Sequence, residues 1–366
     1  MSEQSVVLMA VGDTGPFHAP ANAYGTLVKP TLAQADIRFA QAERLYSERG
    51  TLQVHAEIPN ARLKPELASV FGDCGFDVVS VAGNHALDWG EEAFFDTIAC
   101  LEAQGCKVIG GGRNLAEARR PVVIERKGVK VAFLAYCSIL NHGFAAGPNK
   151  AGVAPMRVHT YYEPVEYQPG IPPRVVTIPY EEDMAAMAAD IAAAKKLADT
   201  VVVSQHWGIH FVPKVIAGYE VTVAEAAFAA GADLILGHHP HVPKAIGVHG
   251  GKVCFYSLGN FIMSRPERSP EQAAHFEKHH GVKLDPDYPR LAYGVDAKRT
   301  LIAKAVLTAK GPARVSFLPA QVDKQLRPEL LRKGDPRFDE AVGYLDWASE
   351  DFVHHFTVDG DEVVVS

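Results

Sequence analysis

The chain has 366 residues, of which 48% are hydrophobic and 22% are charged, and its 36 basic and 43 acidic side chains give a formal net charge of −7. This composition is typical of a globular protein with a large core and excludes disordered chains, collagen-like repeats and small disulfide-rich domains. The acidic balance disfavours non-specific nucleic-acid binding, which needs a basic face, so no nucleic-acid partner is expected. The 5 cysteines are an odd number without a Cys-x-x-Cys pair, which favours free thiols in a reducing compartment.

The first apolar run, over residues 6–11, follows an acidic start. It is too short for the apolar part of a signal peptide and far too short to cross a bilayer. No later segment approaches the length of a spanning helix. We therefore expect a cytoplasmic protein without a membrane anchor.

Apolar runs of strand length alternate with segments of helical spacing through most of the chain. Strands are expected at residues 6–11, 77–82, 107–109, 129–136, 200–204, 234–236 and 253–257. Helices are expected at residues 64–74, 91–104, 181–198 and 221–230. Turn residues predict hairpins over residues 121–135 and 300–318. The pattern predicts an α/β fold with some antiparallel pairing.

Two long segments, residues 141–179 and 264–296, interrupt this alternation and are rich in Gly, Pro and polar residues. Segments of this length are often lids or binding loops, although a surface excursion without a role is an equal alternative. We predict one domain over residues 1–330 with these two insertions, and a C-terminal helix and tail over 331–366 packed on it. Residues 363–365 predict a short edge strand that could pair between molecules, so a homo-oligomer stays open.

Polar side chains follow several of the predicted strands at the point where each strand ends. They are Asp13, Asn84, His85, Asp88, His206, His238, His239, His241 and Asn260. Ligands bind at the carboxyl ends of strands in α/β sheets, so these side chains can converge on one site. Oxygen and imidazole donors without thiolates suit Mn, Fe, Zn or Mg-like ions. On an extended segment, His239 and His241 would lie on one side.

Each of these residues has an ordinary structural explanation when it is taken singly. Asp13 could cap a turn, and Asn260 could satisfy buried backbone groups. The combination of several polar strand ends is what favours a site.

The same residues lie in motifs that together resemble the CapA-type family of bacterial capsule (poly-γ-glutamate) synthesis proteins. The motifs are GD at 12–13, GNHALD at 83–88, GGGRN at 110–114, HWG at 206–208, GHHPHV at 237–242 and YSLGNF at 256–261. The resemblance extends from about residue 6 to about residue 320. That family is similar in fold to the calcineurin-like metallophosphoesterases. The resemblance therefore implies a metallophosphoesterase-like two-sheet α/β sandwich flanked by helices.

The resemblance also implies a site for one or two divalent ions, drawn from Mn, Zn, Mg, Fe and Ca. Its ligands would be Asp13, Glu43, Asn84, His206, His239 and His241, with His238 and His239 as the alternative closing pair. Glu43 takes the place of a bridging aspartate and would follow a strand, although the spacing over residues 36–48 by itself indicates a helix. Related enzymes carry Asp-x-His on the first strand, whereas Asp13 is followed by Thr14 and Gly15, so a mononuclear site stays open.

We expect a metal-dependent hydrolase that acts on an amide, a peptide or another carboxylate-bearing substrate. His85 would be the general acid/base, with Asp13 and Asp88 as further catalytic residues. The candidate substrate-binding residues are Arg113, Lys150, Arg157, His238 and Asn260; His275, His279 and His280 could line a lid. The alternatives are phosphoester hydrolysis, peptide epimerisation and a non-catalytic part in poly-γ-glutamate capsule synthesis. The expected partner is a small-molecule or peptide substrate.

Overall fold

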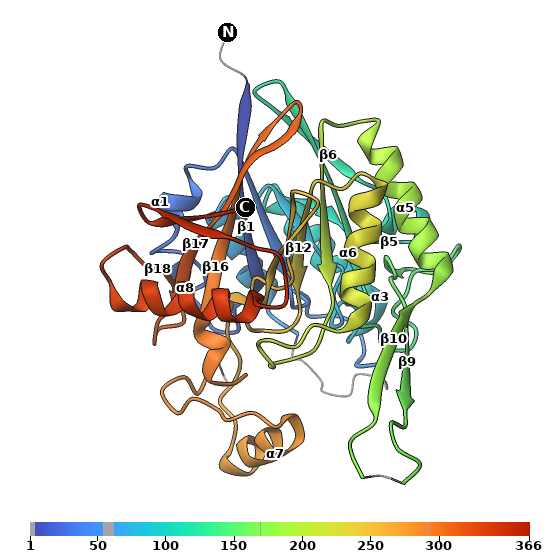
Figure 1. Ribbon diagram of the computed structural model, residues 1–366, viewed down its shortest axis with the longest axis vertical. Coiled ribbons are helices and arrows are strands. Elements are labelled where there is room, and N and C mark those ends of the chain that lie inside the picture. The colour runs from blue at the N-terminus through green and yellow to red at the C-terminus, as the bar shows by residue number, and fades with distance from the viewer. Residues whose placement is uncertain (1–3, 54–61, 169, 292) are drawn as a thin grey trace.

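The computed structural model describes residues 4–53, 62–168, 170–291 and 293–366. Within these ranges, two β-sheets pack face to face, and helices cover their outer faces (Figure 1). This arrangement confirms the predicted α/β fold with two sheets.

The first sheet has ten strands among the described residues, in the order β19-β20-β17-β16-β1-β2-β3-β4, with β15 beside β1 and β18 beside β17. Its strands are β1 (Ser5–Gly15), β2 (Ile37–Ala42), β3 (Val78–Ser80), β4 (Lys107–Ile109), β15 (Asn260–Met263), β16 (Arg299–Thr308), β17 (Gly311–Val322), β18 (Pro328–Leu330), β19 (Phe356–Asp359) and β20 (Glu362–Val365). β1 to β4 are parallel, whereas β16, β17 and β20 are antiparallel to their neighbours. The hairpin predicted over residues 300–318 is confirmed as β16 and β17. β20 pairs with β17 and β19 of its own chain, so its edge is used within the molecule.

The second sheet has the order β13-β14-β12-β11-β7-β6. Its strands are β6 (Val122–Arg126), β7 (Val129–Cys137), β11 (Thr200–His206), β12 (Leu234–His238), β13 (Ile246–His249) and β14 (Lys252–Phe255). The predicted hairpin over residues 121–135 is confirmed as β6 and β7. Two small pairs complete the strands: β5 (Gly111–Gly112) with β8 (Gly152–Val153), and β9 (Val158–Glu163) with β10 (Arg174–Pro179).

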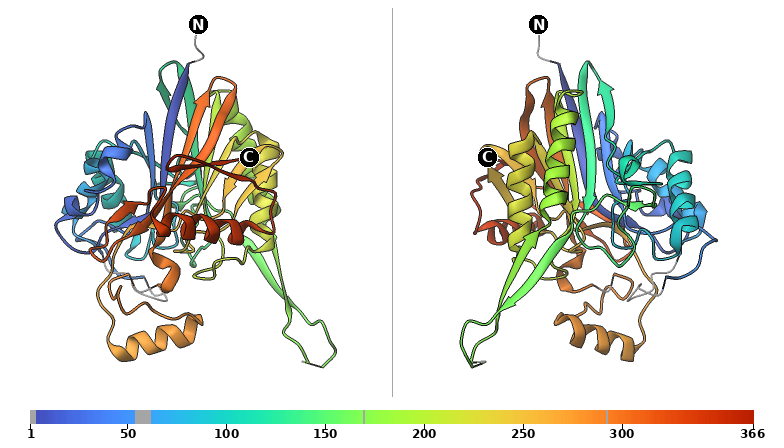
Figure 2. Two further views of the ribbon diagram at one scale, coloured as in Figure 1. Left: turned by 60° about the vertical axis from the view of Figure 1, so that its left-hand side comes forward. Right: turned by 90° about the vertical axis from the view of Figure 1, so that its right-hand side faces the viewer.

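The helices lie on the outside of the two sheets (Figure 2). They are α1 (Lys29–Leu32), α2 (Ser69–Asp73), α3 (Gly90–Ala103), α4 (Leu115–Ala118), α5 (Glu181–Lys195), α6 (Gly218–Ala230), α7 (Pro270–His280) and α8 (Pro336–Ser349), with 3-10 turns η1 (Ala21–Ala23), η2 (Pro65–Ala68) and η3 (Val295–Lys298). The helices expected at 91–104, 181–198 and 221–230 are confirmed as α3, α5 and α6. The stretch 64–74 is shorter than expected, because it divides into η2 and α2.

The main core lies between the two sheets. Phe39 of β2 and Phe133 of β7 stack there with ring centroids 6.1 Å apart. Every residue of β11 is buried, and alternate side chains serve two cores: Val202 faces the inter-sheet core, whereas Val201 and Val203 face α5 and α6. A strand buried on both faces reads as a continuous apolar run, which is why these strands were predictable.

α8 joins the C-terminal segment to the body. The hydroxyl of Ser349 accepts a hydrogen bond from the N–H of Ile246 in β13 at 2.9 Å, and Phe338 is fully buried. Trp347, in the same helix, is 44% exposed.

The structure corrects two sequence expectations. Residues 36–48 were ambiguous between helix and strand, and β2 shows that the helical spacing was misleading, because a strand in the middle of a sheet is apolar on both faces. The segments 141–179 and 264–296 were both expected as loops, but the first contains β8, β9 and β10, and the second contains α7. Its boundaries carry ordinary helix signals, a capping box of Ser269 with Gln272 and a left-handed Gly281.

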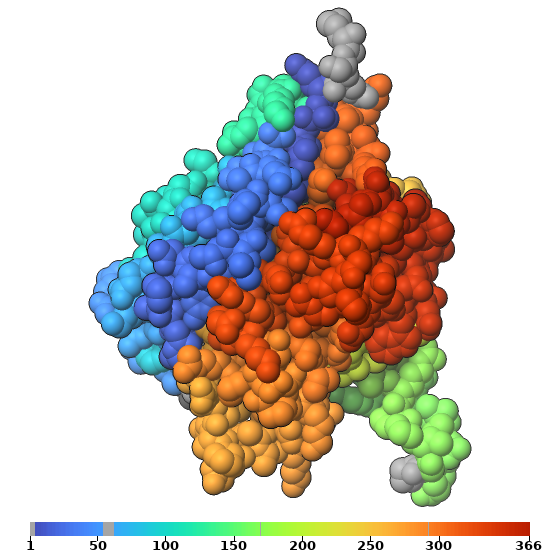
Figure 3. Space-filling view, turned by 90° about the vertical axis from the view of Figure 1, so that its left-hand side faces the viewer, coloured from blue at the N-terminus to red at the C-terminus, as the bar shows by residue number. Residues whose placement is uncertain are grey.

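The segment around α7 and the β9–β10 hairpin extend from the same end of the molecule, and the hairpin projects as an arm (Figures 2 and 3). The carboxyl end of β1 points toward this end (Figure 1). Among the described residues, each helix falls short of the length and apolar character needed to cross a membrane.

Candidate metal centre

The strand registers bring the polar strand ends together. Asp13 of β1 is the parallel partner of Asn260 in β15, and His206 of β11 is the parallel partner of His238 in β12. Glu43 follows β2 directly, and its N–H donates to the carbonyl of Thr14 at 3.0 Å. Residues from both sheets therefore meet at one edge of the sandwich, as the strand-end pattern predicted.

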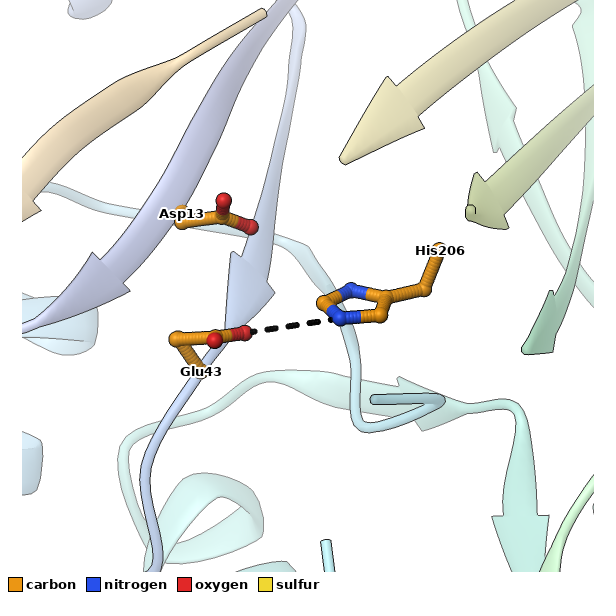
Figure 4. A group of neighbouring side chains, drawn as sticks. All are labelled: Asp13, Glu43 and His206. Atoms are coloured by element: carbon orange, nitrogen blue, oxygen red, sulfur yellow. Dashed lines mark ion pairs between the residues drawn. The ribbon is translucent and has the colours of Figure 1, made fainter. Parts of the chain in front are cut away.

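Asp13, Glu43 and His206 form a buried group in which one ligand atom from each residue lies within 4.8 Å of the others. Figure 4 shows the three side chains pointing toward one another, with His206 Nε2 3.8 Å from Glu43 Oε2. Asp13 and His206 have no solvent-exposed surface. Such a set of two carboxylates and one imidazole is a donor set for a divalent ion.

His241 and Asn84 lie around the same group. His241 Nε2 is 3.6 Å from Glu43 Oε1, and its Nδ1 is 3.5 Å from Asp13 Oδ2. Asn84 Oδ1 is 2.9 Å from His206 Nε2. Two atoms that bind one ion at about 2.1 Å and at right angles lie about 3 Å apart, so this spacing suits shared ligation as well as a hydrogen bond.

Several donor atoms of this centre have no hydrogen-bond partner among the described residues. They are Asp13 Oδ1, both carboxylate oxygens of Glu43, and Nδ1 of His206, His238 and His239. Buried polar atoms without partners are costly, and they are expected where an ion supplies the missing interaction. The residues therefore fit a divalent metal ion.

The electrostatics of the centre point the same way. Burial raises the pKa of Asp13 to about 7, and burial together with the Asp13 charge raises the pKa of Glu43 well above its usual range. Burial and the neighbouring imidazoles lower the pKa values of His206, His239 and His241 well below the usual range. The imidazoles are thus held neutral, the form that binds a metal. The charge of Arg44 lowers the pKa values of both carboxylates, but burial outweighs it, so a further cation would stabilise their charged forms.

His238, His239 and His241 do not lie on one extended segment. β12 ends at His238, and both His239 and His241 have positive φ angles, 99° and 58°. The expectation that alternation places the latter two on one side was therefore wrong, because left-handed backbone turns the chain at both positions. Their imidazoles nevertheless lie near each other, with ring centroids 6.5 Å apart, and the His239 ring is 5.0 Å from that of His206.

His85 lies beside the centre and is oriented by Asp88. Its Nδ1 donates to Asp88 Oδ2 at 2.8 Å, and Asn84 Nδ2 donates to its Nε2 at 3.2 Å. These two bonds define the tautomer with the proton on Nδ1. Nε2 lies 4.0 Å from Glu43 Oε1. Burial lowers the pKa of His85, while the bond to Asp88 opposes that effect.

A cavity of about 960 Å³ opens beside the centre. It is lined by Arg44, Asn84, His85, Asp88, Ile139, Asn141, His210, Phe211, His241, Arg265, Pro266, Glu267, Arg268, Glu271, Gln272, His275, Phe276, His279, His280 and Tyr293. α7 forms one wall, so the three histidines that could line a lid do face the cavity. A space of this size suits a small molecule or a peptide segment.

The three basic residues among the candidate substrate-binding residues, Arg113, Lys150 and Arg157, do not line this cavity. Arg157 Nη2 pairs with Asp183 at 2.7 Å, and Lys150 Nζ donates to backbone carbonyls of its own loop, including that of Ala145 at 3.0 Å. Arg113 lies over the ring of Phe95. All three residues therefore lie outside the lining of the cavity, contrary to expectation. Asp183 holds Arg157, and backbone carbonyls hold Lys150.

His238 and Asn260 also fall outside the cavity, contrary to the expected contact with substrate. Both are fully buried. His238 packs against Phe39, with its Nδ1 3.9 Å from Asp13 Oδ1. Asn260 accepts a hydrogen bond from His241 Nδ1 at 2.8 Å. His238 and Asn260 therefore contact residues of the centre and do not line the cavity.

Sequence reasoning missed several residues that line the cavity, above all Arg44, His210, Arg265 and Tyr293. The His210 ring lies 3.7 Å from that of His239, and burial lowers its pKa to about 3. The available signals were weak: Arg44 directly follows Glu43, and Arg265 comes soon after a predicted strand end.

Residues 9–265 match the family described as "Bacterial capsule synthesis protein PGA_cap". Among curated proteins, the chain is 34% identical to "PGA biosynthesis protein CapA" of Bacillus subtilis (strain 168) over 201 residues, which cover 55% of this chain and 46% of that protein. It is 28% identical to "Capsule biosynthesis protein CapA" of Bacillus anthracis over 251 residues, covering 67% of this chain and 56% of that protein. The chain thus spans about half the length of these curated relatives.

Among solved structures, the chain is similar to "calcineurin-like phosphoesterase YfkN from Bacillus subtilis". The match has a TM-score of 0.37 and 14% identity, and it covers 89% of this chain and 88% of that chain. At this score, the likeness adds nothing to the geometry described above.

Proposed function

The chain belongs to the PGA_cap family of bacterial capsule synthesis proteins, and on that premise we propose that it is a metal-dependent hydrolase. Its substrate is an amide, a peptide or another carboxylate-bearing molecule. The curated relatives are named for capsule or PGA biosynthesis, so a substrate rich in amide bonds and carboxylates is in keeping with the family.

One observation carries the proposal. Asp13, Glu43 and His206 present ligand atoms within 4.8 Å of one another, and several of these atoms are buried without a hydrogen-bond partner among the described residues. The group lies beside a cavity that has room for a substrate. A buried, unsatisfied donor set next to a cavity is the arrangement expected of a catalytic metal site.

Asp13, Glu43 and His206 would hold the ion. Asn84 lies 2.9 Å from His206 and His241 lies 3.6 Å from Glu43, so these two would complete the set together with His239, whose ring centroid is 5.0 Å from that of His206. When bound, a divalent ion lowers the pKa of water to about 7 and polarises a carbonyl or phosphoryl oxygen. The negative charges of Asp13 and Glu43 would stabilise the bound cation in the buried centre.

His85 is the proton carrier at the edge of this centre. It lines the cavity, and Asp88 holds its Nδ1–H at 2.8 Å. Nε2 therefore carries the lone pair and receives a proton during the reaction, then returns it to the leaving group. Asp88 orients the ring and stabilises the imidazolium that forms.

The test is elemental analysis of the purified protein after incubation with Mn²⁺, Zn²⁺, Mg²⁺ or Ca²⁺ and removal of free metal. We expect one or two ions per chain in the wild type and none in the His206→Ala/His241→Ala variant. The matched control is His159→Ala/His355→Ala, which removes two exposed imidazoles and keeps the metal. Amide, peptide and phosphoester libraries are then screened with the loaded protein.

A wild type that binds none of the four metals contradicts the proposal. Metal binding with turnover of phosphoesters alone identifies a phosphoesterase, and inversion of an α-carbon without hydrolysis identifies a peptide epimerase. Metal binding without turnover supports a non-catalytic part in capsule synthesis.

A further inference from the structure

Two arginines of the cavity have guanidinium nitrogens without partners. Arg44 is only 7% exposed, and its Nη2 donates to the hydroxyl of Tyr293 at 2.7 Å. Its Nη1 has no hydrogen-bond partner among the described residues, and the same holds for Nε of Arg265. Both side chains line the cavity. Each therefore has a buried N–H donor that an occupant of the cavity can use.

The acidic side chains of the cavity do not supply the missing partners. Asp88 is bound to His85 at 2.8 Å. Glu267 pairs with Arg290 at 3.0 Å, and Glu271 accepts from the hydroxyl of Ser269 at 2.7 Å.

Within the described part of the chain, Arg44 and Arg265 form no ion pair, and burial lowers the pKa of Arg265. The charge of Arg44 does lower the pKa values of Asp13 and Glu43, but neither arginine has an acidic partner within ion-pair distance among the described residues, and a buried cation in that state is costly. An anionic ligand would remove that cost.

The two arginines lie next to the metal centre. Arg44 directly follows Glu43 in the chain. The ring of Tyr293 stacks on His241 with ring centroids 4.3 Å apart, and the guanidinium of Arg265 lies 5.6 Å from the centre of the same tyrosine ring. Tyr293 thus connects both arginines to a residue of the centre, so a ligand held by them lies within reach of that centre.

We propose that Arg44 and Arg265 form a subsite that binds a carboxylate of the substrate beside the metal centre. The inference deepens the proposed function, on which it rests, by naming the residues that select the substrate. A guanidinium presents its N–H groups in a planar fork that matches the two oxygens of a carboxylate. The subsite therefore favours substrates with a free carboxylate near the bond that is cleaved, and it rejects their neutral amide analogues.

The test measures binding by isothermal titration calorimetry in an amine buffer free of phosphate and carboxylate. The protein is stripped of metal and dialysed, because dicarboxylates also bind metal ions. The probes are glutarate, its uncharged analogue glutaramide, and inorganic phosphate. We expect wild-type protein to bind glutarate, and to bind both glutaramide and phosphate at least tenfold more weakly.

The variants are Arg44→Gln and Arg265→Gln, each checked for folding by circular dichroism and thermal unfolding. Each is expected to weaken glutarate binding at least tenfold. Arg265 is the less buried of the two, so its variant keeps the test decisive if Arg44→Gln fails to fold. The control is Arg332→Gln, which makes the same charge change at an exposed arginine paired with Asp361, and it should bind glutarate as the wild type does.

Three results overturn the subsite: a wild type that binds no glutarate, equal binding of glutarate and glutaramide, or glutarate binding that survives the loss of either arginine. Phosphate bound more tightly than glutarate, with the same dependence on the arginines, overturns the carboxylate assignment. The readout uses neither metal nor turnover. A protein that binds glutarate through the arginines but holds no metal would therefore refute the proposed hydrolase and leave the subsite standing.

Discussion

Asn260 holds His241 in a single orientation. The Asn260 side-chain amide donates to the carbonyls of His241 and Ala297, at 2.9 and 3.2 Å, so its oxygen must face the imidazole. That oxygen accepts from His241 Nδ1 at 2.8 Å. The proton of His241 is therefore on Nδ1, and the lone pair of Nε2 is directed to the side of Glu43, 3.6 Å away.

Replacing Asn260 by alanine is expected to weaken metal binding by about 10- to 100-fold, because His241 loses the partner that sets its tautomer and ring orientation. The measurement is the dissociation constant of Mn²⁺ or Zn²⁺ by competition with a chelating dye. Ser349→Ala is the control, since it removes a buried hydrogen bond to Ile246 that joins α8 to β13. It should lower stability and leave metal affinity unchanged; equal metal affinity of both variants and the wild type would contradict the role of Asn260.

His85→Ala should lower the turnover of the metal-loaded protein by about 10²- to 10⁴-fold, because the proton carrier is lost. Asp88→Asn should lower it as well, since the amide no longer stabilises an imidazolium at His85. Both variants should keep the metal content of the wild type. The measurement is the initial rate on the substrate that the library screen identifies, beside elemental analysis of each sample. A rate that stays at the wild-type value in His85→Ala would remove His85 from the mechanism.

Glu220 and Lys244 should make their least favourable contribution to the free energy of unfolding near neutral pH. Both are fully buried; burial raises the pKa of Glu220 from 4.5 to about 7 and lowers the pKa of Lys244 from 10.5 to about 8. Folding makes Glu220 hold its proton more tightly, so the free energy of unfolding falls as pH rises from about 4.5 to 7. Folding makes Lys244 hold its proton less tightly, so stability is regained as pH rises from about 8 to 10.5.

The check compares the free energy of unfolding by urea in the wild type and in Glu220→Gln/Lys244→Met at pH 5, 7.5 and 9.5. The Gln side chain can still accept the hydrogen bond that Glu220 receives from the Ala217 N–H. We subtract the free energy of unfolding of the variant from that of the wild type at each pH. This difference should be lowest at pH 7.5, by about 1–3 kcal/mol relative to the other two values. A difference that is the same at all three values would show that the pair does not titrate in this range.

Gly12 permits the close approach of β1 to the chain before β15. A Cβ at this position would lie 1.9 Å from the carbonyl oxygen of Gly259. Gly12→Ala should therefore lower the free energy of unfolding by about 2 kcal/mol or more, since two strands that carry the centre must separate. Gly343→Ala is the control: it lies inside α8 in open space and should stabilise by about 0.5–1 kcal/mol. Thermal unfolding of the two variants measures both effects, and an unchanged Gly12→Ala would contradict the close contact.

The sequence predicted the part of the site that depends on strand ends, and the reason is physical. Strands buried on both faces read as apolar runs, and polar residues at their carboxyl ends stand out, as at Asp13 and His206. Glu43 needed the family resemblance, because the spacing of its own segment indicated a helix. Asp13, Glu43 and His206 do meet in space, but their roles as ligands stay predictions.

The residues on the far side of the cavity could not be predicted in the same way. Arg265 and Tyr293 lie in a segment without strand periodicity, and their approach to His241 depends on how that segment folds back. The left-handed backbone at His239 and His241 could not be predicted either, because histidine does not by itself favour positive φ angles. α7 is different: the Ser269 and Gln272 capping box and Gly281 are local signals that a closer reading of helix ends would have used.

The position of β1 in its sheet determines when the centre can form during synthesis. Asp13 leaves the ribosome well before the partners of its strand, because β1 pairs with β15 and with β16, which ends at Thr308. The Asn260 amide that orients His241 also needs the carbonyl of Ala297. A nascent chain therefore carries Asp13 without its strand partners until β16 has been made, and the complete centre depends on contacts between residues that are far apart in the sequence.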